Sequence, residues 1–175
     1  MNLPFLKSVP GEEPVIVEGT FRTTAKKLFE AWTQPEAIKT WFGVGPTGPS
    51  SASIDLRPGG MWEFTFIESD GQTDTLRGEY VEIEPDTRLI FTWEHERQSS
   101  DGKVEVTPQS LVTLDFDLVD NGVRLRLIHE RIVKESGRLG VCEGWNTSFT
   151  KLSQVVEETP LLDSVNTQPE MQRQH

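Results

Sequence analysis

The chain has 175 residues and a formal net charge of −11, from 17 Lys and Arg against 28 Asp and Glu. This length suits one domain, because a chain of roughly 150 residues buries about 68–70% of its unfolded surface. So acidic a surface repels nucleic-acid phosphates and anionic lipid headgroups, which argues against nucleic acid and membrane as partners. The single cysteine, Cys142, excludes an internal disulfide. With no signal-peptide pattern and no apolar run of about 20 residues, we expect a cytoplasmic protein.

Composition divides the chain into three segments. Residues 1–13, with two prolines and two glutamates, are expected to form an N-terminal arm. Residues 14–160 carry the periodic apolar patterns of a folded domain, and Pro160 is expected to stop its last helix. Residues 161–175 are polar, rich in Gln and aperiodic, which is typical of a tail.

The first part of the domain changes its period after a short strand at residues 15–21. Apolar side chains recur at helical spacing over residues 25–32, which predicts an amphipathic helix. Thr33 and Glu36 have the spacing of a capping box, so a second short helix is expected to start there. Residues 43–51 are rich in Gly, Pro and Ser and predict a loop.

From Ala52 onward the apolar period is two, which predicts strands with one buried face. Asp120-Asn121-Gly122 lies between two such runs and predicts a tight hairpin turn. The predicted inward-facing sets are Trp62, Phe64 and Phe66; Leu89, Phe91, Trp93 and His95; Val112, Leu114, Phe116 and Leu118; and Val123, Leu125, Leu127 and His129.

A further strand is expected at about residues 75–84, but its facing is ambiguous. Tyr80 and Val81 are adjacent, so both cannot point inward in a regular strand. A β-bulge at Gly78 would resolve the conflict, because a bulge adds one residue to a strand.

The last predicted element is a helix over about residues 139–158. Small residues, Gly144 and Ser148, lie beside its apolar stripe and would either let backbones approach or leave space against a sheet. The stripe consists of Val141, Trp145, Phe149, Leu152 and Val156.

Several motifs in this order resemble one known superfamily. The chain is similar to the START-like SRPBCC superfamily and, within it, to the branch named for the activator of the heat-shock protein 90 ATPase. The motifs are Leu28 to Glu36 (LFEAWTQPE), Trp41-Phe42, Asp55 to Trp62 (DLRPGGMW), Phe91-Thr92-Trp93, the strand ending at His129, and Gly144-Trp145. The resemblance covers residues 15–158. It implies an α+β helix-grip fold, also found in the birch-pollen allergen: a curved antiparallel sheet wraps a long C-terminal helix, and two short helices follow the first strand.

The resemblance implies a fold more sharply than a function. The superfamily includes lipid carriers, cyclases, hydroxylase subunits and other ligand binders, and one fold hosts many functions. The eukaryotic activator carries an additional N-terminal domain that engages the chaperone, for which 175 residues leave no room. A chaperone partner is therefore the least supported expectation.

The aromatic inner faces allow two interpretations. The rings could simply fill the core, or they could line a gap of about 300–1,000 Å³ between a curved sheet and the helix, as ligand pockets do. The second interpretation places an entrance near residues 43–51. Its candidate ligand-binding residues are Trp41, Trp62, Phe64, Tyr80, Phe91, Trp93, His95, His129, Trp145, Ser148 and Phe149.

The polar candidates at such a cavity are Tyr80, His95, His129 and Arg57. The two histidines are expected at the same end of the sheet, as rim groups, as structural residues or as a general acid or base. Two histidines and Cys142 do not make a convincing metal site, so no metal or cofactor is expected. Arg57 is better explained by a turn salt bridge with Asp55, and Cys142 by an inert buried thiol.

Three functional hypotheses remain open. The leading one is binding of a small apolar or aromatic molecule between the sheet and the last helix. The alternatives are an enzyme of polyketide-cyclase or hydrolase type in the same cavity, and a chaperone-linked protein-interaction module. An exposed edge of the first strand would also favour a homodimer.

Overall fold

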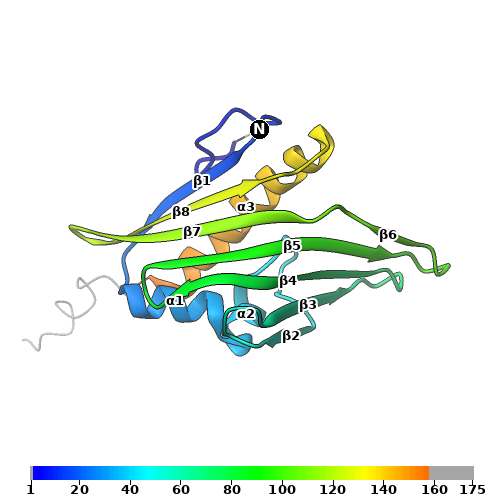
Figure 1. Cartoon of the computed structure of the whole chain (residues 1–175), viewed down its shortest axis with the longest axis horizontal. Coiled ribbons are helices and arrows are strands. Elements are labelled where there is room, and N and C mark those ends of the chain that lie inside the picture. Colours follow the sequence, from blue (N-terminus) through cyan, green and yellow to red (C-terminus); the bar gives the residue numbers. More distant parts are fainter. Residues whose placement is uncertain (1, 158–175) are drawn as a thin grey trace, which may run out of the picture.

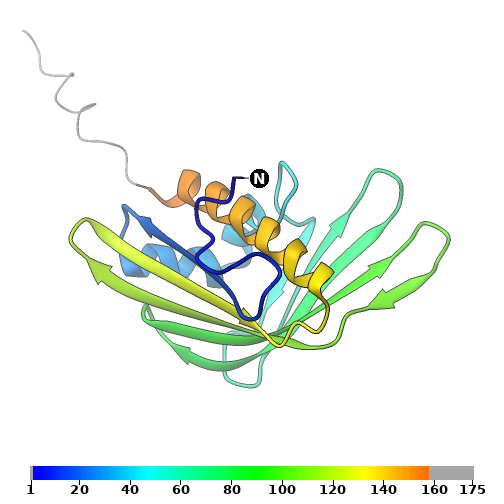
Figure 2. The same ribbon diagram turned by 90° about the horizontal axis from the view of Figure 1, so that it is seen from above.

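The computed structural model describes residues 2–157, which form a curved antiparallel sheet, two short helices and one long helix (Figure 1). The long helix lies across the hollow face of the sheet (Figure 2). This arrangement is the α+β helix-grip fold that the sequence predicts. The predicted C-terminal tail and Pro160 lie outside the described residues.

The sheet has eight strands in the order β1-β8-β7-β5-β4-β3-β2, with β6 paired to β5 beyond the end of β7. Successive neighbours are antiparallel, so each inward-facing set predicted from the alternation shares one face of the sheet. The strands are β1 (Val15–Phe21), β2 (Ser51–Ile54), β3 (Met61–Ile67), β4 (Thr73–Glu84), β5 (Arg88–Gln98), β6 (Val104–Val106), β7 (Ser110–Val119) and β8 (Gly122–Glu130).

The predicted hairpin joins β7 to β8. Val119 pairs with Gly122, which leaves Asp120 and Asn121 as a two-residue loop. Gly122 has a φ of +155°, and a Cβ atom there would lie 2.0 Å from the carbonyl oxygen of Phe21. Only glycine fits this close approach between the turn and the end of β1.

The first two helices follow β1 as expected. In α1 (Ala25–Thr33), the Thr24 hydroxyl oxygen accepts the Lys27 backbone N–H at 3.1 Å and caps the helix. The predicted capping box of Thr33 and Glu36 is wrong. Thr33 is the last residue of α1, and its hydroxyl donates to the Phe29 carbonyl oxygen at 2.9 Å. Gln34 precedes α2 (Pro35–Trp41) without a side-chain cap, and Pro35 occupies the first turn.

The long helix α3 (Glu135–Val156) begins four residues earlier than the apolar stripe suggested. No side chain caps its start. Instead, the Arg138 guanidinium donates to the carbonyl oxygens of Ile132, at 2.7 Å, and Gly11, at 2.5 Å. These polar contacts carry no apolar periodicity, which is why the pattern missed the first turn.

The N-terminal residues pack along β1 rather than away from it. Lys7 donates its backbone N–H to the Ile16 carbonyl at 2.8 Å, and Glu18 donates to the Phe5 carbonyl at 2.9 Å. The expected exposed edge of the first strand is therefore wrong, because residues 5–7 cover it. The argument for a homodimer through that edge falls with it.

The helices cover only part of the hollow face. The β3–β4 and β5–β6 hairpins extend past α3 (Figure 2). We call residues 65–76 and 95–106, which form this extension, the overhang, and the part of the sheet packed against the helices the grip. None of the helices formed by residues 2–157 is long and apolar enough to cross a membrane.

Candidate functional site

Aromatic rings fill most of the space within the grip. Trp62 of β3 lies 4.9 Å from Phe64 and 5.4 Å from Phe91 between ring centroids, and the Phe42–Phe64 distance is 5.0 Å. On the helix side, the Trp32 ring lies 5.8 Å from the Trp145 ring. These separations are those of packed rings. Core packing therefore accounts for most of the aromatic set.

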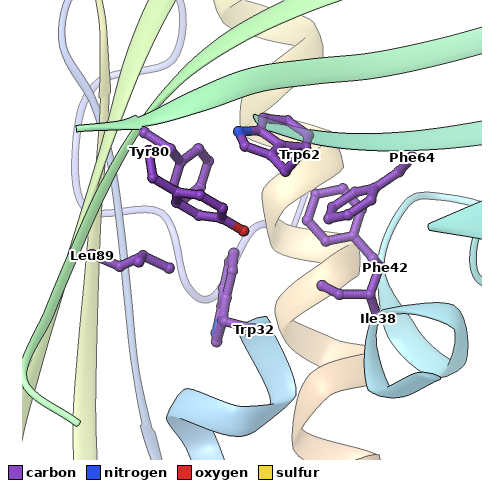
Figure 3. Close-up of a pocket in the computed structure, with 8 residues that line it drawn as sticks. Trp32, Ile38, Phe42, Trp62, Phe64, Tyr80 and Leu89 are labelled. Carbon is purple, nitrogen blue, oxygen red and sulfur yellow. The ribbon is translucent and has the colours of Figure 1, made fainter. Parts of the chain in front are cut away.

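A small cavity lies between the β3–β5 strands and the helices α1 and α2 (Figure 3). Its volume is about 10 Å³, roughly the space for one water molecule. No side chain of α3 lines it, so it does not lie between the sheet and the last helix, where the sequence predicted a ligand site. The lining residues are Trp32, Ile38, Phe42, Trp62, Phe64, Tyr80, Leu89 and Phe91.

The predicted site residues are therefore split between the cavity and other surroundings. Trp62, Phe64, Tyr80 and Phe91 line the cavity, as the ligand-binding interpretation requires. Phe42, one of the aromatic residues that the sequence interpretation considered for such a gap, also lines the cavity, whereas Trp32, Ile38 and Leu89 were missed. These three residues belong to predicted apolar runs, but the helix and strand patterns were not combined into one wall.

Tyr80 is the polar group of this cavity. The register of β4 against β5 shifts between Tyr80 and Glu82, so a bulge turns Tyr80 inward while Val81 is 54% exposed. Figure 3 shows the Tyr80 hydroxyl directed toward Trp32. The hydroxyl has no hydrogen-bond partner in the described part of the chain, and burial raises the pKa of Tyr80.

Gly78 is not the bulge that was predicted. A Cβ atom at Gly78 would lie 1.8 Å from the Thr92 carbonyl oxygen and 2.7 Å from the Trp62 indole nitrogen. The glycine thus lets β4 and the Trp62 ring approach closely. The indole N–H groups of Trp62 and Trp32 are both buried without a hydrogen-bond partner in the described structure.

His129 lies outside the cavity, in a buried chain of hydrogen bonds. The Trp145 indole N–H donates to His129 Nδ1 at 3.1 Å, which fixes the proton of the neutral ring on Nε2. That N–H donates to the Ser110 hydroxyl at 2.8 Å, and Ser110 in turn donates to the Trp93 carbonyl at 3.3 Å. Complete burial lowers the pKa of His129 to about 3. His129 therefore cannot accept a proton from Ser110, and the pair is structural.

His95 lies on the overhang, where its Nε2 is 2.8 Å from Asp74 Oδ1. His95 and His129 have different hydrogen-bond partners and do not bond to each other. Among residues 2–157, no group of three or more His, Cys, Asp or Glu side chains could hold a metal ion. Burial raises the pKa of the Cys142 thiol, which favours the inert form.

The remaining candidates have structural surroundings. Trp41 is fully buried and donates its indole N–H to the Ala31 carbonyl at 3.0 Å, and Phe149 packs against Phe5 and Phe21. Ser148 accepts the Gly43 backbone N–H at 3.2 Å. Arg57 pairs with Asp55 in an exposed turn, with 2.9 Å between Nε and Oδ2.

The predicted entrance, residues 43–51, is held against α3. Besides the Ser148 contact, Lys151 of α3 donates to the Gly45 carbonyl oxygen. Phe42, the last cavity-lining residue before this loop, is the C-cap of α2. The loop therefore continues directly from one wall of the cavity.

Comparison with known proteins identifies the family. A family described as "Activator of Hsp90 ATPase homolog 1-like protein" matches residues 22–157. No curated protein sequence matches the chain. A protein from Nitrosomonas europaea is similar in structure, with a TM-score of 0.66, 21% identity, and coverage of 89% of this chain and 97% of that one.

Two further solved structures are similar. The AHSA1 protein from Silicibacter pomeroyi has a TM-score of 0.67 and 23% identity, over 81% of this chain and 95% of that one. DynU16, a protein of the dynemicin biosynthetic locus, has a TM-score of 0.62 and 19% identity, over 88% of this chain and 48% of that one. These likenesses establish the fold and confirm the resemblance noted in the sequence.

Proposed function

The chain belongs to the family of Activator of Hsp90 ATPase homolog 1-like proteins, and on that premise we propose that it binds a small apolar or aromatic molecule carrying one polar group. The proposed site is the cavity between β3–β5 and the two short helices. The observation that carries the proposal is the buried Tyr80 hydroxyl, which is directed into an otherwise apolar cavity and lacks a partner (Figure 3).

An unpartnered buried polar group costs about 1–3 kcal/mol. A ligand with a carbonyl or hydroxyl oxygen near Tyr80 would recover this cost, and its apolar body would contact the surrounding rings. The indole N–H groups of Trp32 and Trp62 also lack partners, but Figure 3 shows both nitrogens on the ring edges away from the Tyr80 hydroxyl. With Tyr80 as its polar group and no carboxylate in its lining, the cavity favours a neutral ligand with one hydrogen-bond acceptor.

The cavity must enlarge before it can hold more than a water. Its volume of about 10 Å³ lies far below that of ligand pockets, which measure about 300–1,000 Å³. Its sheet wall is fixed by the ladders of β3, β4 and β5. The other wall includes Phe42 and α2, which are joined to the loop held by Ser148 and Lys151. We therefore propose that a ligand enters by displacing Phe42 and this loop.

One structural neighbour supports a small-molecule role. DynU16 comes from a biosynthetic locus, although this chain spans only about half of its length. The cytoplasmic location stays a prediction.

The test is a screen of neutral aromatic ketones, phenols and hydrocarbons against the full chain, read by tryptophan fluorescence and thermal shift. Trp32 and Trp62 report directly, because both line the cavity. Tyr80→Phe should weaken the binding of ketones and phenols about 5- to 30-fold, the equivalent of one hydrogen bond, and leave the affinity for hydrocarbons unchanged. The outward-facing Val81→Ala is the matched control.

Two outcomes would overturn the proposal. If no compound shifts fluorescence or melting, the cavity holds only water, and the chaperone-linked interaction module becomes the better hypothesis. If compounds bind but Tyr80→Phe changes the affinities for ketones and hydrocarbons equally, the ligand site lies elsewhere.

A further inference from the structure

The overhang carries a second cluster of functional side chains, separate from the cavity. In the register of β3, β4 and β5, Phe66 pairs with Asp74, Asp74 with Arg97, and Leu76 with His95. Directly paired residues point to the same side of a sheet, and alternate residues along one strand do too. These side chains therefore share one face of the sheet with Phe64 and Trp93. The hairpins that carry Asp74 and His95 extend past α3 (Figure 2).

Asp74 is the centre of this cluster and is only 14% exposed. Its Oδ1 lies 2.8 Å from His95 Nε2 and accepts Arg97 Nε at 3.0 Å, while its Oδ2 accepts Gln72 Nε2 at 3.1 Å. Burial alone would raise the pKa of Asp74, but the hydrogen bonds from His95, Arg97 and Gln72 outweigh it and hold the pKa below its ordinary value. The carboxylate is therefore ionised at neutral pH.

An ionised Asp74 fixes the state of His95. Since the carboxylate only accepts, His95 Nε2 must carry a proton and donate it, which leaves Nδ1 of the neutral ring with a free lone pair. No residue of the described chain bonds to Nδ1. The His95 side chain is 30% exposed, so solvent and solutes reach it. This is the arrangement of a base oriented by a carboxylate.

We propose that His95 is a general base, positioned by Asp74, for a weakly acidic C–H or O–H group of a flat neutral molecule. Phe66, Leu76 and Trp93, which are half-buried on the same face, would hold the apolar body of that molecule. His95 Nδ1 takes the proton, and the electron pair stays on the substrate, where it is delocalised or expels a leaving group. Asp74 compensates the positive charge that forms on the imidazole ring.

The charges around His95 argue for a neutral substrate. Asp74 and Arg97 face it from β4 and β5, and Glu105 of β6 lies opposite Arg97. One guanidinium between two carboxylates leaves no positive charge to hold an anion. The proposal does not rest on ligand binding in the cavity, because none of these residues lines it.

The experiment uses 5-nitrobenzisoxazole, a flat neutral C–H acid, with the full chain. The base removes the ring C–H proton, the released electron pair forms the third bond of a nitrile, and the N–O bond breaks to release a coloured phenolate. The wild type should exceed His95→Gln about 10- to 100-fold in second-order rate constant, which is at or below the lower end of the range of about 10²–10⁴-fold for general acid–base catalysis. His95→Gln keeps His129 and His175, so the loss is specific to His95.

Asp74 is tested as a positioning residue. Asp74→Asn should leave KM near the wild-type value and lower kcat about 3- to 10-fold, because it disturbs the orientation of His95 and not the binding of the substrate. Glu79→Gln, on the opposite face of β4, is the matched control and should match the wild type. In case His95→Gln fails to fold, carbethoxylation of folded wild-type protein, mapped by mass spectrometry, should remove activity in proportion to modification of His95. Equal rates for wild type and His95→Gln, or activity that survives modification of His95, would overturn the proposal.

Discussion

The grip and the overhang share the same strands but differ in what covers them. Along β5, Leu89 and Phe91 are 1% and 5% exposed under the helices, whereas Trp93 is half-buried and the His95 side chain is 30% exposed. All four alternate on one face, as the sequence predicts. Alternation therefore selects the face, and the helices decide which part of that face becomes core.

The two histidines differ in the same way, because His129 is buried in the grip and His95 is partly exposed on the overhang. His129 is enclosed by Trp145, Trp93 and Ser110, and both of its ring nitrogens are used. His95 uses one nitrogen on Asp74 and keeps the other free. A buried histidine with two neutral partners stabilises the neutral ring, whereas a half-exposed one beside a carboxylate can exchange a proton.

The largest expected effect separates the two regions by stability. Phe149→Ala removes a fully buried ring that contacts Phe5, Phe21 and Trp32, and should cost about 3–5 kcal/mol in the free energy of unfolding. Leu76→Ala, in the overhang, removes a half-buried side chain and should cost clearly less, about 1–2 kcal/mol. Urea denaturation followed by tryptophan fluorescence measures both.

Equal losses in these two variants would mean that the overhang is packed as tightly as the grip. An unchanged slope of the free energy against urea would confirm that both variants unfold as the wild type does.

The second effect is a pH dependence that arises within the grip. His129 has a pKa of about 3 in the folded chain and about 6.5 in the unfolded chain, so the unfolded state binds more protons between these values. The contribution of His129 to the free energy of unfolding is therefore complete above about pH 7 and is lost as the pH drops from about 6.5 toward 3. Between pH 7 and pH 5 the loss from this residue should be about 2 kcal/mol.

His129→Gln isolates this contribution, because glutamine does not titrate. The variant should be less stable than the wild type at pH 7, yet should lose about 2 kcal/mol less on going to pH 5. Carboxylates contribute equally to both proteins and cancel in the comparison. Parallel pH profiles would show that His129 is not held neutral by burial.

Periodicity predicted the strands and helices because each buries one regular face, and the resemblance to a known family implied how they are arranged. The turn at Asp120-Asn121-Gly122 could also be predicted, since a two-residue hairpin has its own residue preferences. The site was harder to predict because it depends on how separate elements pack together. Trp32 and Phe42 line the cavity only because α1 and α2 pack over β3–β5.

Two other features could not be predicted from the sequence, for physical reasons. The β4 bulge lies at Val81 rather than at Gly78, because Gly78 is needed to accommodate the Thr92 carbonyl and the Trp62 ring, and no local pattern reports that contact. The Asp74–His95 pair joins residues 21 positions apart through the β4–β5 register. A bulge shifts that register by one residue, so sequence spacing alone cannot place the pair.

The smallest expected effect concerns the overhang cluster. Asp74→Asn keeps a hydrogen-bond acceptor and removes a charge that lies beside the 52% exposed Arg97 and the half-exposed His95. Because solvent screens such pairs, the loss of stability at pH 7 should be below about 1 kcal/mol. Part of that loss should vanish in acid, because the lowered pKa of Asp74 stabilises the folded chain only while the carboxylate is ionised. Urea denaturation at pH 7 and pH 3 measures it. A loss of stability as large as that of Phe149→Ala would show that the cluster helps hold the fold together. A small loss is consistent with Asp74 acting mainly to position His95.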